Sequence, residues 1–547
     1  MAGSLRAVNG CHRFNNEHVG TTCEGNRHMQ LNMSADSLKD WTFVEGAWSQ
    51  NGDGVMTAPS ELVDRNLAIF TAQAYTDFEA RFEFRWDLPW TSAGLVFAGR
   101  SALDYFVLNF PVVGQHFRKE HFWGGIGRVD ESGFIKTVSN RKRLEQIGGV
   151  PSEIGLWHDV RLVVEAGVAR AWVDRRPMAQ FADVRLCESG FVGLLTYASL
   201  AKGVKSSFRN LHVQGRAAAT TWDDSVKPRR NWSLITDLCG TSTTNIVRAG
   251  NADLLFATQV DEHSDQRRSV SFRSSDNGRT WDGPEPMPLV WALNARCDGE
   301  LVGTYMSHNP PFTFSITTSN DHGKTWSPVD ESTELNVPDT ARWAQFTGTT
   351  VVLDDGTLVW FTVVHDPGRQ DEVSAYAGCI RSTDEGRTWS QPIPINGPGP
   401  MPEHVMKDKD VDSETCGALT QEGRIVAFVR NSEPTMYECS SDDGGLTWRP
   451  AARGPFANYA GMSSMLTTRS GVVLLGGRFP GIGVQVSYDH GYTWQCTETD
   501  AATWAQGGMI EVEDDVVLHV YGGPDHPHQI RRQLLHVTPE GLEAVFE

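Results

Sequence analysis

The sequence SSDNGRTW, at residues 274–281, recurs as SNDHGKTW at 319–326, STDEGRTW at 382–389, SDDGGLTW at 441–448 and SYDHGYTW at 487–494. The five copies share the pattern Ser-x-Asp-x-Gly-x-Thr-Trp and begin 45 to 63 residues apart. Similarity at such a period is typical of a repeated supersecondary unit. Within each copy, aspartate can accept hydrogen bonds from its own turn, glycine permits the turn, and tryptophan can pack between sheets. The motif is therefore predicted to be structural.

Each repeat also carries a tight turn between two apolar strands. A variable polar loop follows the second strand, and a third strand leads into the eight-residue motif. Six such turns occur, near Gly250, Gly299, Gly356, Gly423, Gly471 and Asp514. The sequence therefore predicts six blades of a β-propeller over residues 231–547.

The region before the repeats has the pattern of a different β unit. Between residues 40 and 214, strand patterns follow one another without a helical period, as in FEARFEFRW at 78–86, where apolar and polar residues alternate. This pattern predicts an antiparallel β-sandwich. The order of WHDVRLVVEAGVARAWVDRRPMA, SGFVGLLTY and SFRNLHV resembles the laminin-G or concanavalin-like jelly rolls. We expect an N-terminal extension over 1–39, the sandwich over 40–214 and a polar linker over 215–230.

Composition and charge narrow the class of protein. The chain has 547 residues, too many for one ordinary core, and its formal net charge of -20 argues against nucleic acid or an anionic membrane as a partner. No stretch approaches the ~18 uninterrupted apolar residues of a membrane helix. The N-terminus carries no secretion-signal pattern, so we expect a cytoplasmic protein, or a secreted one if a leader has been removed.

The sequence shows no pattern for a bound metal or cofactor. Its nine cysteines are scattered, odd in number and never spaced as CxxC, so neither a disulfide framework nor a zinc site is predicted. HExxH, Walker-type and EF-hand patterns do not occur. We predict no cofactor, although backbone carbonyls could bind a structural calcium ion. A homo-oligomer is left open.

The eight-residue motif is similar to the Asp-box, or BNR repeat, of the sialidase-like β-propeller superfamily. With five copies the resemblance is specific, and it implies an all-β fold in which a sandwich is followed by a six-bladed propeller. That superfamily includes sialidases, other exo-glycosidases such as arabinanases, and proteins without enzymatic activity. The fold alone therefore leaves the chemistry open.

Strand direction predicts which loops gather around the propeller axis. In an antiparallel blade, the tight turn and the eight-residue motif lie at one end, so the loop between the second and third strands lies at the other, with the entry to the first strand. Functional residues are expected at that loop end. Candidates that leave a second strand are Asp261, His263, Asp265, His308, His365, Arg369, Arg430, Arg478 and Tyr521, and candidates that enter a first strand are Glu414, Tyr459, Trp504 and Gln506.

Register singles out three of these residues. Arg430 and Arg478 each stand seven residues beyond a tight-turn glycine, Gly423 or Gly471. Two arginines at equivalent positions of neighbouring blades could hold one carboxylate through forked hydrogen bonds. In sialidases a glutamate opens a first strand and an arginine closes the next, and Glu414 and Arg430 stand in that relation.

The resemblance implies further roles. Arg478 matches another arginine of the carboxylate-binding triad of sialidases. Asp265, with Asp261 as second choice, matches an acidic residue on the loop before the first Asp-box. The similarity thus places an acid, a glutamate and two arginines around one pocket.

Two features depart from the sialidase pattern. The first arginine of the triad has no counterpart at the expected strand entry, since Arg248 lies beside a tight turn. The nucleophilic tyrosine has none either, because Trp504 or Gln506 occupies its position and Tyr459 lies one blade earlier. The resemblance therefore does not extend to the whole catalytic set.

Three hypotheses about function follow. The working hypothesis is an exo-acting glycoside hydrolase whose substrate ends in an anionic sugar, sialic acid or a uronic acid, held by Arg430 and Arg478. Glu414 and Asp265 would form its acid/base pair. One alternative is a lyase that acts on uronates by β-elimination, and the other is a glycan-binding protein without turnover. Competing proton donors are His263, His308 and His365.

The sandwich could also contribute to carbohydrate binding. The candidate residues for binding sugar rings are aromatic residues that we expect to be exposed, such as Trp90 or Trp123. Structural support of the propeller is the other expected role of this unit.

Overall fold

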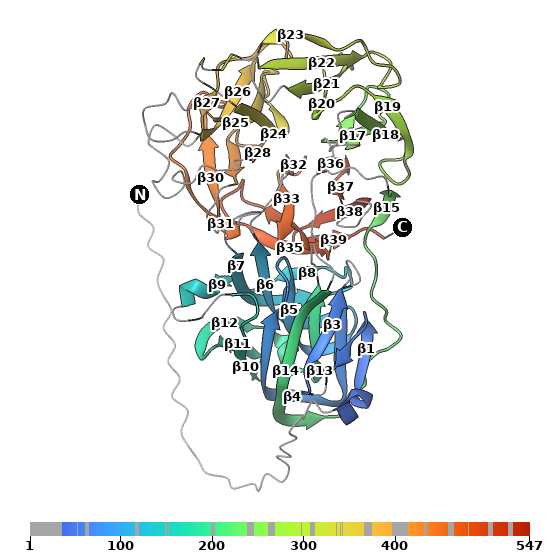
Figure 1. The fold of residues 1–547 in the computed structure, drawn as a ribbon, viewed down its shortest axis with the longest axis vertical. Coiled ribbons are helices and arrows are strands. Elements are labelled where there is room, and N and C mark those ends of the chain that lie inside the picture. The colour runs from blue at the N-terminus through green and yellow to red at the C-terminus, as the bar shows by residue number, and fades with distance from the viewer. Residues whose placement is uncertain are drawn as a thin grey trace, which may run out of the picture.

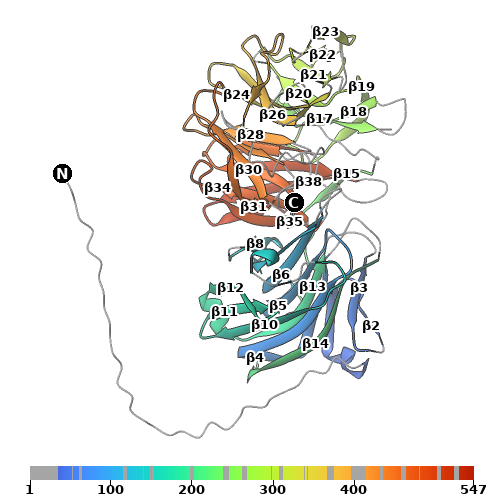
Figure 2. The same ribbon diagram turned by 60° about the vertical axis from the view of Figure 1, so that its left-hand side comes forward.

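The computed structural model describes residues 35–51, 53–60, 65–114, 120–139, 141–147, 150, 153–197, 203–237, 245–260, 268–296, 298–306, 312–334, 336–337, 339, 341, 343–365, 375–395, 414–430, 435–457, 464–479, 481–501, 507–522 and 529–546. Within these ranges the helices are the short 3-10 segments η1 (Ala35–Asp40), η2 (Leu144–Ile147) and η3 (Val184–Cys187). No helix of the described residues is long and apolar enough to cross a membrane. The predicted all-β class is confirmed. Figures 1 and 2 show two bodies, one formed by β1 to β14 and one by the later strands.

The N-terminal unit is built around one long strand, β4 (Asn66–Trp86). Its first part pairs with β1 (Trp41–Glu45) and β13 (Gly190–Tyr197), and its second part pairs with β10 (His158–Glu165) and β14 (Gly203–Ala218). The strand thus passes from one group of strands to another. The other strands are β2 (Ser49–Gln50), β3 (Met56–Ser60), β5 (Ser92–Ser101), β6 (Asp104–Gly114), β7 (Glu120–Val129), β8 (Ile135–Thr137), β9 (Lys142–Arg143), β11 (Val168–Val173) and β12 (Arg176–Ala182).

Alternation along β4 places aromatic side chains in one core. Phe82, Phe84 and Trp86 are buried, whereas Arg81 before them is exposed and Glu83 and Arg85 between them are partly exposed. Trp86 satisfies its indole N–H by donating to the Phe110 carbonyl at 2.8 Å. The predicted strand at 78–86 is therefore confirmed, while the jelly-roll topology of the unit stays a prediction.

The C-terminal unit contains four-stranded antiparallel sheets around a common centre (Figure 1). In each of them the strands follow chain order, and the first strands lie nearest the centre. Four sheets are β16 (Val247–Arg248), β17 (Leu254–Val260), β18 (Arg268–Ser274) and β19 (Asp282–Met287); β20 (Ala292–Ala295), β21 (Leu301–Met306), β22 (Thr313–Ser319) and β23 (Asp330–Glu334); β24 (Trp343–Val352), β25 (Leu358–His365), β26 (Ala375–Ser382) and β27 (Ile393–Pro394); β28 (Thr415–Leu419), β29 (Ile425–Val429), β30 (Thr435–Ser441) and β31 (Ala452–Ala457).

A fifth sheet joins the two ends of this unit. Its strands β36 (Gly507–Glu513), β37 (Val516–Gly522), β38 (Ile530–Thr538) and β39 (Gly541–Ala544) come from the C-terminal end of the chain. The edge of β38 is paired with β15 (Ser233–Thr236), which comes from the start of the unit. Early and late segments therefore share one sheet, which closes the ring.

The prediction of six blades is wrong, because among the described residues five propeller sheets are separate. The strands β32 (Ser464–Thr467), β33 (Val473–Phe479), β34 (Gly481–Ser487) and β35 (Gln495–Asp500) also pair in chain order. Their sheet, however, continues into the N-terminal unit, because β35 pairs with β8 and forms part of an 18-stranded sheet. The physical reason is that β8, which pairs with β7, has a second edge whose backbone groups hydrogen-bond to β35.

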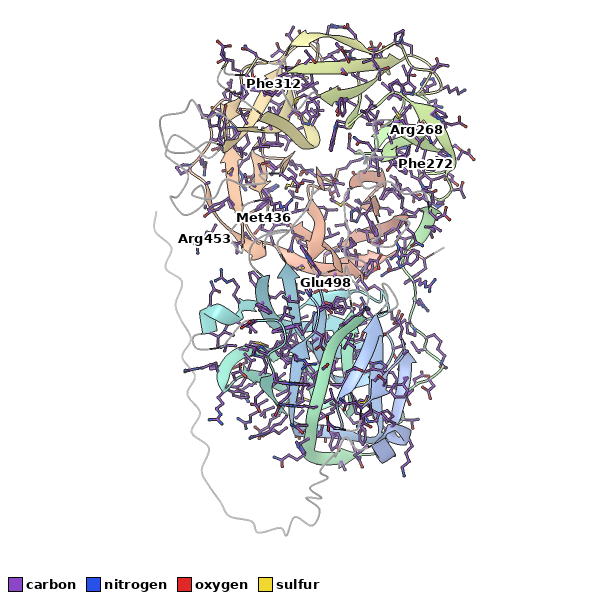
Figure 3. All side chains as sticks on the ribbon, in the orientation of Figure 1. Arg268, Phe272, Phe312, Met436, Arg453 and Glu498 are labelled. Carbon is purple, nitrogen blue, oxygen red and sulfur yellow. The ribbon has the colours of Figure 1, made fainter. Side chains whose placement is uncertain are left out.

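Buried polar contacts reinforce this junction. The carboxylate of Glu498, on β35, accepts hydrogen bonds from Arg141 and from the hydroxyl of Tyr197, both in the N-terminal unit. Tyr197 in turn accepts from the amide of Asn109 at 2.7 Å. Figure 3 labels Glu498 at the contact between the two bodies. The N-terminal unit is thus fixed to one edge of the propeller by sheet pairing and by a buried carboxylate.

The eight-residue motifs close the third strand of their sheets. In the first copy, Asp276 accepts hydrogen bonds from the Thr280 backbone at 2.8 Å and the Thr280 hydroxyl at 2.6 Å. Ser274 Oγ accepts from the Gly278 N–H at 2.8 Å, and Gly278 has a φ of 83° that favours glycine. The same bonds recur around Asp321, Asp384, Asp443 and Asp489. The predicted structural role of the motif is confirmed.

The tryptophans of the last two motifs pack against a neighbouring sheet. Trp448 lies edge-on to Phe361 of β25 with ring centroids 6.1 Å apart, and Trp494 lies edge-on to Phe428 of β29 at 5.3 Å. Burying large rings at these contacts supplies apolar surface between sheets. The repeats therefore stabilise one another rather than fold as independent units.

We expect the substitution Asp443→Asn to make stability less dependent on acid. Hydrogen bonds from Thr447 and Ser441 outweigh the opposing desolvation and lower the pKa of Asp443 in the folded state. A lowered pKa means that the carboxylate stabilises the fold above the ordinary value of 3.8 and loses this effect as the pH falls through the folded-state pKa. The substitution should cost about 1 kcal/mol at pH 7 and flatten the decline in stability below pH 4.

Urea denaturation at several pH values measures this effect. Asp442→Asn is the matched control, because Asp442 is adjacent and exposed and pairs only at the surface with Arg449 at 2.5 Å. An equal change in both variants would contradict the structural role assigned to the motif carboxylate.

Candidate functional site

The hairpin of β28 and β29 positions two of the predicted site residues. Its strands pair from Thr415 with Val429 to Leu419 with Ile425, and its tight turn contains Gly423 with a φ of 79°. Glu414 immediately precedes β28 and Arg430 immediately follows β29, so both lie at the end opposite the tight turn. The predicted relation between these two residues is therefore present.

Glu414 and Arg430 form a buried ion pair. Arg430 Nη1 donates to Glu414 Oε2 at 2.5 Å, and the Arg430 backbone N–H donates to the Glu414 carbonyl at 2.9 Å. Each residue is 8% exposed. Because desolvation offsets most of the attraction between buried charges, such a pair is weak evidence for a role in stability alone. Its position at the loop end makes it the candidate centre of a functional site.

The thiol beside this pair is unreactive. Burial, together with the charge of Glu414, raises the pKa of Cys416 far above the range of a reactive thiol. The neutral thiol form is therefore retained at any working pH. Cys416 fills space in the hairpin and does not act as a nucleophile.

The other predicted residues are described to different extents. Arg478 lies in β33 and His365 ends β25, so their backbones stand near the loop ends of their strands. Their side chains are not described. The predictions that lie outside the described residues are Asp261, His263, Asp265, His308, Arg369, Tyr459, Trp504 and Gln506.

Tyr521 lies in a buried network at the loop end of β37. Its hydroxyl donates to Asp500 Oδ2 at 2.7 Å, and Arg531 Nη1 donates to the same oxygen at 3.1 Å. Burial and the neighbouring Asp500 raise the pKa of Tyr521 well above its ordinary value. In this arrangement Tyr521 is a neutral phenol that positions Asp500, and its predicted contact with substrate stays a prediction.

His519 is a buried neutral imidazole two residues earlier on β37. Burial lowers the pKa of His519 to about 3, and its ring lies 4.9 Å from that of Tyr521. A group with this pKa carries no proton near neutral pH and cannot serve there as a general acid. His519 is therefore a packed core residue of β37.

Arg248 lies at the turn end, as the sequence indicated. Its guanidinium donates to the Ala252 carbonyl at 3.0 Å and to Asn277 at 3.2 Å. It thus holds a tight turn against a motif and does not complete an arginine triad with Arg430.

The expectation of exposed aromatic residues in the sandwich is wrong for Trp90 and Trp123. They are 5% and 6% exposed and belong to one apolar cluster with Met465 and Phe428 of the propeller. The two rings are covered by the propeller, and the sequence of the sandwich alone gives no sign of this contact. These tryptophans serve the junction rather than a free binding surface.

Sequence reasoning missed the second buried ion pair of the propeller. Asp500 and Arg531 are 5% and 2% exposed. The two residues belong to different sheets, so no local pattern in the sequence links them. The available signal is that Asp500 ends β35 and Arg531 begins β38, both at the loop end. Among the described residues, no group of three or more metal-binding side chains that could hold an ion is found.

The repeats, their closing motifs and the ring of sheets define a repeat-type β-propeller preceded by a second β unit. Two family descriptions match the chain. The BNR repeat-like domain matches residues 302–499, a range that includes Glu414 and Arg430. The 3-keto-alpha-glucoside-1,2-lyase-like domain matches residues 32–214, close to the predicted sandwich.

Comparison with individual proteins gives distant similarities. A sialidase of Clostridium perfringens is 28% identical over 118 residues, which are 18% of this chain and only 28% of that protein. Among solved structures, a Hadza microbial sialidase is 15% identical with a TM-score of 0.44, covering 90% of this chain and 97% of that one. A protein of unknown function from Dyadobacter fermentans is 19% identical with a TM-score of 0.43, covering 58% of this chain and 98% of that one. The BNR match, the sialidase relative and the propeller together support a sialidase-like β-propeller.

The buried ion pair predicts an asymmetric response to mutation. Arg430→Ala leaves the Glu414 carboxylate buried without this partner and should lower the free energy of unfolding by about 3–5 kcal/mol. The double substitution Glu414→Leu with Arg430→Met removes both charges at similar volume and should cause little or no loss of stability.

Equilibrium urea denaturation of the three proteins measures this difference. Arg449→Ala, which removes an exposed arginine from the connection between β30 and β31 of the same sheet, is the control. Equal stability of Arg430→Ala and the wild type would show that the pair is not held as a buried unit.

Proposed function

We propose that the protein is an exo-acting, sialidase-like glycoside hydrolase that acts on a glycan ending in an anionic sugar, sialic or uronic acid. The observation that carries this proposal is the buried Glu414–Arg430 pair at the loop end of β28 and β29. The pair lies within the range that matches the BNR repeat-like domain. A sialidase among the relatives supports the same class of substrate.

Arginine is suited to the carboxylate of such a sugar. Its planar guanidinium presents donors in a fork that matches a carboxylate, and it remains charged at any working pH. Arg478, at the equivalent register of the neighbouring sheet, is proposed as the second arginine. An anionic sugar would thus be bound against the net charge of -20 by local positive groups.

Glu414 is proposed as one member of the acid/base pair. Glycoside hydrolysis needs two such groups on either side of the scissile bond, about 5–5.5 Å apart for retention and about 6.5–9.5 Å for inversion. We propose Asp265 as the other member, with Asp261 as second choice. Tyr521 is a poor nucleophile in its buried neutral state, so a covalent tyrosine intermediate is not part of the proposal.

The N-terminal unit is proposed to be a jelly-roll sandwich that supports the propeller. Its pairing through β8, the buried Glu498 and the covered Trp90 and Trp123 favour support over a free lectin surface. We propose that the boundary between the N-terminal unit and the propeller lies close to residues 215–230. The strand β14 continues through Ala218 into that range.

The substitution Glu414→Gln should lower kcat on the true substrate by about 10²–10⁴-fold, because it removes a proton-transferring group at similar volume. Fluorogenic α-sialosides and β-glucuronides are the test substrates, and a β-glucoside is the neutral comparison. Glu422→Gln is the matched control, since Glu422 is an exposed glutamate in the tight turn of the same hairpin.

The outcomes separate the three functional hypotheses. Full turnover by Glu414→Gln would overturn the assigned role of Glu414. Ultraviolet absorbance from a new carbon–carbon double bond would identify a lyase. Binding of glycans without product from any substrate would identify a glycan-binding protein instead of an enzyme.

A further inference from the structure

A cavity of about 120 Å³ lies between the two units, away from the Glu414–Arg430 pair. It is open to solvent and is lined by the N-terminal unit, the connecting segment after β14 and the end of β35, next to the junction seen in Figure 2. Its volume is roughly eight times what one water molecule needs, so it can hold a molecule of several heavy atoms. Side chains that line it include Glu45, Arg65, Arg229, Arg230, Trp232 and Asp500.

Three arginines converge on this cavity from separate segments. Arg65 precedes β4 and donates to the Gly133 carbonyl at 2.5 Å, which fixes it at the wall. Arg229 and Arg230 come from the connecting segment, are exposed, and also line the cavity, with the Arg229 guanidinium 5.0 Å from the ring centroid of Phe546. Two carboxylates also line the cavity, and one of them, Asp500, is already paired with Arg531 at 3.1 Å. The lining is therefore locally positive in a chain of net charge -20.

An aromatic ring gives the cavity an apolar wall as well. Trp232 has the guanidinium of Arg531 3.7 Å from its ring centroid and that of Arg230 at 5.5 Å. The cation contacts hold the ring and the two arginines as one group. A ligand that combines a negative charge with a carbon skeleton would meet both kinds of surface.

We propose that this junction cavity is a binding site for a small hydroxylated organic acid, such as a uronic acid monosaccharide. Arg229 and Arg230 bind its carboxylate, and its carbon skeleton lies against Trp232. The shared chemistry of candidate ligands is an oxyanion, and the size of the cavity and its aromatic wall favour an organic acid over inorganic phosphate. This site is separate from the proposed active site and does not depend on the proposed function.

Isothermal titration calorimetry with D-glucuronate, inorganic phosphate and D-glucose tests the proposal. The titrations use the wild type and the double variant Glu414→Leu with Arg430→Met, which lacks the charges of the proposed active site. We expect glucuronate to bind both proteins and glucose to bind neither at this site. Adding Arg229→Gln with Arg230→Gln to either protein should weaken this glucuronate binding at least tenfold.

The matched control removes two other exposed arginines, by Arg216→Gln with Arg449→Gln, whose side chains are 69% and 62% exposed. It leaves glucuronate binding unchanged if the site is built as proposed. An equal loss in the control would show nonspecific attraction by charge and would overturn the proposal. Binding of phosphate without glucuronate, or of neither, would overturn it too. The experiment measures heat of binding, and it includes a variant that lacks the proposed catalytic pair. Its outcome is therefore independent of whether the protein is a glycosidase.

Discussion

The bonds that hold the aspartate of each eight-residue motif determine at which end of the propeller the loops between second and third strands lie. Each carboxylate is bound by threonine and backbone donors of its own turn, so the third strand ends at the serine of the motif. In the fourth motif, for example, Asp443 accepts hydrogen bonds from Ser441 and Thr447, and β30 ends at Ser441. Since the strands are antiparallel, fixing one end of a sheet also fixes which loops emerge at the other. Glu414 and Arg430 meet because their hairpin obeys this register, with Gly423 at the far end.

Local register was accessible from the sequence because turn chemistry and strand alternation leave local signals. Counting from Gly423 was sufficient to place Arg430 opposite Glu414, and alternation was sufficient to place Phe82 and Phe84 in the core. The pairing of β35 with β8 leaves no such signal, because it depends on two edges that are far apart in the chain. The same contact covers Trp90 and Trp123, which is why their predicted exposure was wrong.

The cavity at the junction was inaccessible for a related physical reason. Its walls come from segments before β4, after β14 and at the end of β35, so no periodicity brings them together. The sequence did show a polar, arginine-bearing linker at 215–230, but it could not show that Arg229 and Arg230 would line one cavity with Trp232 and Asp500. A site between two units depends on how they dock, whereas a site within one hairpin depends on its register.

The two ends of the propeller treat negative charge differently. At the turn end, the motif carboxylates are bound by neutral donors, which is enough for groups such as Asp443 that remain in contact with water. At the loop end lie the ion pairs with both members buried among the described residues, Glu414–Arg430 and Asp500–Arg531. Buried pairs contribute little net stability relative to apolar side chains, because desolvation offsets their attraction. Stability is therefore a weak reason to keep two of them at this end, and the proposed function gives such pairs another role, the orientation of charged groups toward an anionic ligand.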